Sequence, residues 1–384
     1  MPNGDVAIAA FKKQKALITG ASGRMAAEML TRLGFACSVA DLYADRDSRL
    51  ICESRVTKLQ KLSDLGDCEQ LVREHDFVVF AGGLEGCPTL ARKLAQWTKP
   101  AFMSGETIEE LSDYRVLNRA MTESGIDRYL FSRDPQQIDF SNSISKDLRH
   151  SGTAKRTTAE DFGDGFQHPL VAQQFIDGKS VSVIFCASSD GVKSLGGSIQ
   201  LTDEKNPFSW VGSVSGLQLD PEQLRRATTF AISLTRRARL HGVFGIDFIL
   251  NEDGIWPVDV NPRIPASAEV VGDHVMQHHL NAFGIDCPVV SEQNKAVRIK
   301  RVLFNRMSSP ICFYPGSIKN IPIHFLDASL PASIADVPCD GELIEPGHPI
   351  LTVVASAVDE REARAGVSRI KSTIFAALSC ENEP

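Results

Sequence analysis

The sequence predicts a mixed α/β and α+β protein of two or three domains that begins with an open, mostly parallel sheet. Three observations carry this prediction. Strand-like and helix-like segments alternate between residues 15 and 140, which is typical of an open sheet covered by helices. Long β segments replace this alternation from residue 169 onward. Residues 242–263 read as an apolar hairpin that carries a few polar side chains.

The N-terminal region supplies the parallel sheet. Short apolar runs alternate with amphipathic segments, and glycines or prolines stand where each segment ends. Gly34 ends the first helix, and the third strand runs into Gly82 and Gly83. The expected elements are strands at 16–19, 36–40 and 77–81 and helices at 24–33 and 90–97.

The stretch 132–168 is polar and has little apolar periodicity, so we expect a linker or a mobile loop there. Beyond it the chain returns to regular patterns. We expect strands at 170–176, 180–187 and 194–201, helices at 221–240 and 359–378, and short strands within 296–357. We therefore divide the chain into parts at 1–112, 113–295 (with a small β-rich subdomain at about 140–205) and 296–384, the last packing on the second.

The hairpin poses an electrostatic problem. Asp253 and Gly254 form a strong turn signal, and a three-residue loop at 252–254 places Asp247 opposite Asp259. Two carboxylates that face each other across strands repel, and inside a cleft each raises the pKa of the other. A cation between them removes this cost. The alternative is a surface hairpin that carries two acids by chance, but its strands are too apolar for a free edge.

The same strand face holds two further polar groups. Alternation places Asn261 beside Asp259, so three oxygen ligands converge, two of them anionic. Such a set suits Mg²⁺, which commonly also binds substrate phosphates. Arg263 follows on this face, where its planar guanidinium can hold a phosphate. We predict a metal site at Asp247, Asp259 and Asn261, with Arg263 next to it.

The composition of the chain indicates which partners and which cellular compartment to expect. The net charge of −7 argues against nucleic acid or an anionic membrane as the main partner. Nine cysteines without C-x-x-C spacing indicate reduced thiols rather than a disulfide framework or a zinc site. The sequence shows no signal peptide pattern, and no apolar run approaches the about 18 residues that span a membrane. We expect a cytoplasmic protein.

Weaker motifs elsewhere suit phosphate or substrate binding. Residues 20–24, Gly-Ala-Ser-Gly-Arg, join a strand to a helix, where backbone N–H groups can hold an anion. Three interpretations stay open for this loop: a tight turn, a site for a substrate carboxylate or phosphate, and a dinucleotide site with Asp41 on the ribose. Lys146 precedes a loop with Gly152 and can clamp phosphates, or lie in a solvated loop. Residues 173–178 can pair with an adenine edge, or be a plain strand end.

Other polar clusters favour structural roles. His274, His278 and His279 share a predicted helix, but no glutamate completes a metal-binding pattern, so we expect surface or packing roles. The arginines at 225, 226, 236, 237 and 239 indicate a solvated helix face.

In this order, the motifs resemble the ATP-grasp superfamily. The spacing of Asp247, Asp259, Asn261 and Arg263 is similar to its Mg·ATP hairpin, with Asp259 where glutamate is usual. The whole chain resembles the branch of predicted ATP-dependent carboligases related to biotin carboxylase. The telling segments are Gly-Ala-Ser-x-Arg at 20–24, Asp-Leu-Tyr-Ala-Asp-Arg-Asp at 41–47, Gly-Gly-Leu-Glu at 82–85, Asn-Pro-Arg-x-x-Ala-Ser at 261–267, and the pattern at 335–350.

The resemblance implies an ATP-grasp architecture behind an N-terminal pre-ATP-grasp domain, and it implies roles for particular residues. ATP would be held with Mg²⁺, and Lys146 and Arg263 would act on the phosphates and the substrate. The implied nucleotide contacts are Lys146, Gly152, Gln173, Gln174, Ile176 and Ser180, the last standing where a ribose-binding glutamate is common. The implied substrate contacts are Gly20, Ser22, Arg24 and Glu85.

The implied function is an ATP-dependent carboxylate–amine ligase that acts through an acyl phosphate, with the loop at 147–165 closing to exclude water. The partners are small-molecule carboxylates and amines, and a homodimer stays open. By analogy, the substrate is an amino acid such as glutamate, in the biosynthesis of a one-carbon carrier of the tetrahydromethanopterin or methanofuran type. The alternatives are a non-catalytic ATP-grasp binding protein and an NAD(P)-binding Rossmann-type oxidoreductase.

Overall fold

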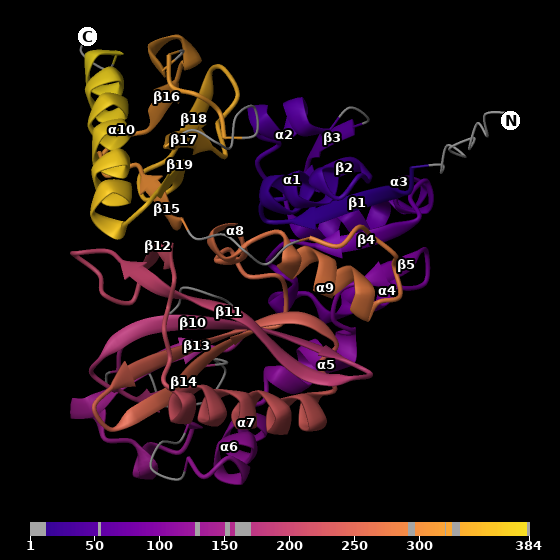
Figure 1. The fold of residues 1–384 in the computed structure, drawn as a ribbon, viewed down its shortest axis with the longest axis vertical. Coiled ribbons are helices and arrows are strands. Elements are labelled where there is room, and N and C mark those ends of the chain that lie inside the picture. The colour runs from indigo at the N-terminus through magenta and orange to yellow at the C-terminus, as the bar shows by residue number, and fades with distance from the viewer. Residues whose placement is uncertain are drawn as a thin grey trace, which may run out of the picture.

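The computed structural model describes residues 13–52, 55–126, 131–149, 154–157, 170–290, 296–318, 320–324 and 331–381. Figure 1 shows an N-terminal domain beside a C-terminal segment, and both lie above the strands of residues 179–261 in the central sheet. The predicted fold class, α/β together with α+β, is confirmed. Within the described residues, no helix combines the length and the apolar character needed to cross a membrane.

The N-terminal domain is built on the predicted parallel sheet, with strand order β3-β2-β1-β4-β5. Its order reverses between β1 and β4, and in open α/β sheets such a switch point is where ligands bind, outside the carboxyl ends of the strands. The strands are β1 Lys15–Gly20, β2 Ala36–Asp41, β3 Arg55–Lys58, β4 Phe77–Phe80 and β5 Lys99–Ala101. Its helices are α1 Arg24–Arg32, α2 Arg46–Ile51, α3 Glu69–Arg73, α4 Pro88–Leu94 and α5 Gly105–Leu111. Helix α6, Tyr114–Glu123, lies away from this sheet and packs beside α7, Pro221–Ala238 (Figure 1).

The central sheet is antiparallel, with strand order β14-β13-β10-β11-β12-β15-β19-β17. Helix α7 packs on one face of it and also contacts α6. The strands are β10 Lys179–Ser188, β11 Gly191–Thr202, β12 Trp210–Ser215, β13 Gly242–Asn251, β14 Gly254–Asn261, β15 Val297–Phe304, β17 Ala332–Ala335 and β19 Pro349–Ala357. The helices nearby are α7 Pro221–Ala238, α8 Ala268–Val271 and α9 His274–Ala282.

The C-terminal segment is hydrogen-bonded into the central sheet, whereas the sequence predicted only that it packs on the second part of the chain. Its strand β15 pairs with β12, so that β15, β19 and β17 extend the central sheet. Helix α10, Glu360–Glu381, packs against β19 and β15, and strands β16, Ile311–Phe313, and β18, Glu342–Ile344, pair beside it.

The prediction of an unstructured stretch at 132–168 was wrong in part. A small sheet with order β6-β9-β7-β8 draws strands from it. Strand β7 contains a single apolar residue, Ile144, so its sequence has no alternation to recognise, and its pairing with β9 supplies its hydrogen bonds. The strands are β6 Phe131–Ser132, β7 Ser143–Asp147, β8 Lys155–Arg156 and β9 Leu170–Gln174.

Candidate functional site

The hairpin of β13 and β14 places the two acids as predicted, but by a different route. Asp247 pairs with Asp259. The turn has two residues rather than three, because Asn251 pairs with Gly254, whose φ is 135°. A bulge next to Pro257 adds the residue that restores the register. Proline cannot donate to the ladder and is tolerated on an edge strand. Strand β14 lies at the edge of the central sheet, so the expectation that the hairpin is too apolar for an edge was wrong.

Alternation along β10 explains why the site is polar on one face only. Val181 and Val183 point into the core that α7 covers, whereas Ser180 and Ser182 line the cavity on the opposite face. Ser182 stands directly opposite Asp247 on β13. The polar row is therefore a consequence of the strand period.

Asp247 lies at the floor of this face. Burial, followed by the charge of Asp259, raises the pKa of Asp247 to about 6. Hydrogen bonds from Ser182, Gln200 and Asn261 oppose that rise in pKa, and the Asn261 amide nitrogen lies 3.2 Å from the Asp247 carboxylate. The carboxylate is thus oriented by three donors but still meets an opposing acid, which favours a cation between the two.

Lys146 reaches the hairpin of β13 and β14 from β7. Its ammonium donates to Asp259 Oδ1 at 3.1 Å and to the carbonyl oxygen of Val258. It also lies 5.1 Å from the centre of the Phe131 ring, and its side chain is only 8% exposed. The lysine that was predicted to contact phosphate therefore already lies beside a predicted metal ligand.

Arg263 joins the hairpin to the N-terminal domain. Its Nε forms an ion pair with Glu85, and its Nη2 donates to Asn261 Oδ1 at 3.0 Å. It runs past Gly82, where a Cβ would lie 3.7 Å from Arg263 Nε. Gly82 follows β4, so Arg263 and Glu85 lie at the switch point of the parallel sheet.

A cavity of about 700 Å³ runs between the small sheet and the central sheet. It brings together the predicted residues Lys146, Gln173, Gln174, Ile176, Ser180, Asp247, Asp259, Asn261 and Arg263. Gly152, which was also predicted to contact the nucleotide, lies outside the described residues, as does most of its loop.

The end of the cavity near Ile176 is aromatic. The Arg156 guanidinium carbon lies 3.9 Å from the centre of the Phe175 ring, and Phe208 meets Phe175 edge to face. All three residues line the cavity, together with Trp210. Flat apolar walls of this kind suit a stacked heterocyclic base.

The predicted substrate loop at 20–24 is tightly packed. A Cβ at Gly20 would lie 2.7 Å from the Gly82 carbonyl oxygen, so the two turns of the switch point touch. Ser22 is half-buried in this loop. Asp41 is fully buried and accepts hydrogen bonds from the backbone N–H groups of Gly23 and Ala44 at 2.7 and 2.6 Å. Its carboxylate is therefore occupied, which disfavours a role on a dinucleotide ribose.

The structure contradicts the prediction that Arg24 contacts the substrate. Its side chain is 1% exposed and all of its nitrogens are used inside the protein. It pairs with Glu28 and Glu269, and its Nε donates to Asp336 Oδ1 at 2.9 Å. Since Asp336 follows β17 and Glu269 lies on α8, Arg24 joins three parts of the chain. The sequence could not reveal this, because its partners are 245 and 312 residues away.

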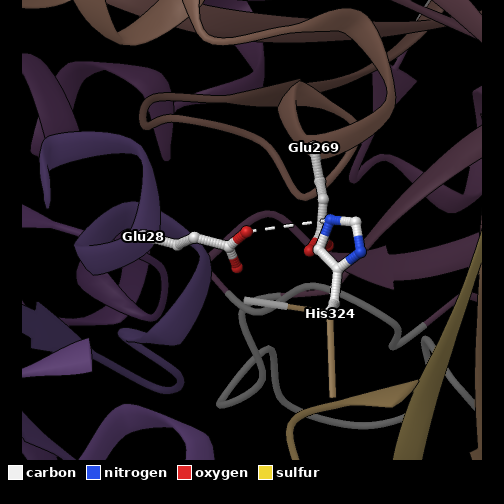
Figure 2. A group of neighbouring side chains, drawn as sticks. All are labelled: Glu28, Glu269 and His324. Carbon is white, nitrogen blue, oxygen red and sulfur yellow. Dashed lines mark ion pairs between the residues drawn. The ribbon is translucent and has the colours of Figure 1, made fainter. Parts of the chain in front are cut away.

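Figure 2 shows the neighbouring group of Glu28, Glu269 and His324, whose potential ligand atoms lie within 4.8 Å of one another. Burial opposes the charge of Glu269, but Arg24 and Lys300 hold its pKa well below the usual range. The ammonium of Lys300 lies 2.7 Å from Glu269. Both glutamates are already neutralised by basic side chains, so we interpret this group as a clasp between domains rather than a metal centre.

The remaining polar clusters have structural roles. His274 and His279 are buried and hydrogen-bond backbone carbonyl oxygens at 2.9 and 2.8 Å, as expected for packing. In the described part of the chain the cysteines whose side chains are defined are all free thiols.

Sequence reasoning missed Gln200. Its carbonyl oxygen accepts a hydrogen bond from the Ser180 hydroxyl, and its side chain also hydrogen-bonds Asp247. It thereby joins a predicted nucleotide contact to a predicted metal ligand. The sequence offered one signal, a polar side chain within strand β11. That signal points to the site only when the pairing of β11 with β10 is known.

The elements that form this site match known proteins in sequence and in structure. Residues 120–267 match the family model described as the ATP-grasp domain, which spans the small sheet, the hairpin and Arg263. This chain carries an ATP-grasp domain. The uncharacterized protein MJ0776 of Methanocaldococcus jannaschii is 27% identical over 190 residues, which are 49% of this chain and 42% of that protein. The alignment thus spans less than half of that relative.

Solved structures with this fold superpose on nearly the whole chain. The L-amino acid ligase from Bacillus licheniformis superposes with a TM-score of 0.65 at 15% identity, covering 94% of this chain and 98% of its own. The biotin carboxylase domain of the Hydrogenobacter thermophilus 2-oxoglutarate carboxylase gives 0.66 at 12% identity, covering 94% and 89%. At these identities the likeness establishes the ATP-grasp fold, and the predicted superfamily is confirmed.

Proposed function

We propose that this protein is an ATP-dependent carboxylate–amine ligase that acts through an acyl phosphate. One observation carries the proposal: Asp247, Asp259 and Asn261 converge in a single cavity with Lys146 and Arg263. Two facing acids and an amide supply hard oxygen ligands, while two basic side chains supply partners for phosphate oxygens. The ADP–Mg and bicarbonate complex of the H. thermophilus carboxylase domain supports ATP and Mg²⁺ as the cofactors.

The residues fit this chemistry. Mg²⁺, when bound at Asp247, Asp259 and Asn261, screens the charge on the β- and γ-phosphates. Lys146 lies within reach to donate to a phosphate oxygen once a nucleotide enters. Arg263, on the side of the N-terminal domain, would hold the carboxylate being phosphorylated and stabilise the oxyanion when the amine attacks. Gln173, Gln174, Ile176 and Ser180 would hold the base and ribose.

The order of events follows from the chemistry of carboxylates. A carboxylate repels nucleophiles because of its charge, and transfer of the γ-phosphoryl group of ATP onto it forms a carbon–oxygen–phosphorus link with a good leaving group. The amine then attacks the acyl carbon, and phosphate leaves. We place the acid between Arg263 and the switch-point turns that carry Gly20, Ser22 and Glu85, since Arg263 lines the cavity and forms an ion pair with Glu85.

The substrate proposal is finer and rests on analogy. The amino acid ligase among the structural neighbours supports an amino acid as one partner. We propose that glutamate or a similar amino acid is joined to a precursor of a one-carbon carrier cofactor of the tetrahydromethanopterin or methanofuran type.

Calorimetry tests the nucleotide claim. Wild-type protein and Asp259→Ala are titrated with ATP in Mg²⁺ buffer and, separately, with NAD(P)H. We expect ATP to bind the wild type and to lose most of its affinity in the variant, whereas binding of NAD(P)H alone would refute the proposal. A screen for ADP release over pairs of carboxylates and amines then separates an enzyme from a non-catalytic binding protein.

A further inference from the structure

The ion pair between Lys146 and Asp259 links the two halves of the proposed site before any ligand enters. Lys146 comes from the small sheet and Asp259 from the central sheet. The ammonium donates to Asp259 Oδ1 at 3.1 Å and to the carbonyl oxygen of Val258, and both atoms belong to β14. Lys146, which we propose as a phosphate contact, is therefore paired with Asp259, which we propose as a metal ligand.

The ammonium of Lys146 offsets the repulsion between the opposed carboxylates of Asp247 and Asp259. Asp247 and Asp259 face each other in register, and burial and Asp259 together disfavour the charge on Asp247. Lys146 neutralises Asp259, while Asp247 is satisfied by neutral donors on Ser182, Gln200 and Asn261. Lys146 thus supplies a positive charge next to the place proposed for the cation.

A metal ion that arrives alone must compete with this positive charge. A divalent cation on Asp259 lies within a few ångströms of the ammonium, so either the ion pair breaks or two positive charges approach each other. The lysine side chain is 8% exposed, so water screens little of that repulsion. A nucleotide changes the balance, because its phosphates give Lys146 a new anionic partner as the metal takes Asp259.

We infer that Lys146 blocks the metal site of the free protein and that metal and nucleotide enter together, each strengthening the binding of the other. This inference rests on the proposed function, since it assumes that a nucleotide and a metal share the cavity. Linkage makes the coupling reciprocal, and coupled sites commonly differ by about 5- to 150-fold in affinity.

The test measures Mn²⁺ binding to the full-length protein by electron paramagnetic resonance, without nucleotide and then with ATP. The variant is Lys146→Gln, and the matched control is Lys205→Gln, which removes an exposed positive charge from a loop of the same domain. Without nucleotide we expect Lys146→Gln to bind Mn²⁺ roughly tenfold more tightly than the wild type. The control should match the wild type, and ATP should strengthen Mn²⁺ binding less in Lys146→Gln than in either.

Two results would overturn the inference, and they are distinguishable. If the wild type binds Mn·ATP but Lys146→Gln binds bare Mn²⁺ no more tightly, only the blocking role of the lysine fails. If the wild type binds no Mn·ATP, the proposed function fails with it. Lys146→Met, measured in the same way and checked by circular dichroism, replaces the glutamine variant should that one not fold.

Discussion

Replacing Asp247 by asparagine should stabilise the protein while it removes a ligand of the proposed metal site. The pKa of Asp247 lies at about 6 rather than its ordinary 3.8, chiefly through burial and then through Asp259. A rise of this size corresponds to about 3 kcal/mol against the charged form at neutral pH. The carboxylate faces the cavity and asparagine accepts fewer hydrogen bonds, so we discount the expected gain to about 2 kcal/mol.

The sign of the pH dependence follows from linkage. The folded protein holds the Asp247 proton more tightly than the unfolded chain, so this group favours folding below pH 4 and its contribution is lost as the pH rises through about 6. Asp247→Asn should therefore match the wild type near pH 4 and exceed it above pH 6. A gain of about 2 kcal/mol corresponds to a rise in Tm of roughly 2 to 3 °C for a chain of 384 residues.

Thermal unfolding by differential scanning calorimetry at pH 4.5 to 8 measures this difference. Asp253→Asn is the matched control, because this residue is exposed at the tip of the same hairpin. A Tm for Asp247→Asn that equals or falls below that of the wild type at pH 7 would refute the account of Asp247 as a strained acid. ATP with Mg²⁺ should raise the Tm of the wild type but not that of the variant.

Three further changes test other parts of the site. Arg24→Met leaves its buried acidic partners unpaired and should destabilise the protein by about 3 to 5 kcal/mol, seen as a large fall in Tm; Arg73→Met, on the exposed surface, should change little. Gln200→Leu removes a donor to Asp247, the proposed metal ligand, and should weaken Mg·ATP binding about tenfold by calorimetry, with Gln200→Asn retaining more; equal binding would exclude the positioning role. Arg156→Ala should weaken ATP binding about fivefold and leave the affinity for inorganic triphosphate unchanged, if the guanidinium acts on the base rather than the phosphates.

The hairpin was predictable because its signals are local. The alternation of β13 and β14 and the Asp-Gly turn brought Asp247 opposite Asp259 from the sequence alone. The turn length was wrong by one residue, and the bulge beside Pro257 compensated for that error. The period-2 pattern thus predicted which side chains face each other better than it predicted the turn and the bulge of the backbone.

Contacts between distant segments could not be predicted. The role of Arg24 depends on Glu269 and Asp336, and that of Gln200 depends on the order of strands in the central sheet. Strand β7 was missed because its buried residues, Ser143, Ser145 and Lys146, are polar and give no apolar alternation. In each case a long-range partner, rather than the local pattern, decides the structure.

Isothermal titration calorimetry of ATP, with and without Mg²⁺, on the wild type and Asp259→Ala tests the central claim most directly. We expect one site per chain whose affinity for ATP depends on Mg²⁺ and is lost in Asp259→Ala, while that variant still melts cooperatively. ATP binding that is indifferent to Mg²⁺ and to the loss of Asp259 would contradict this claim.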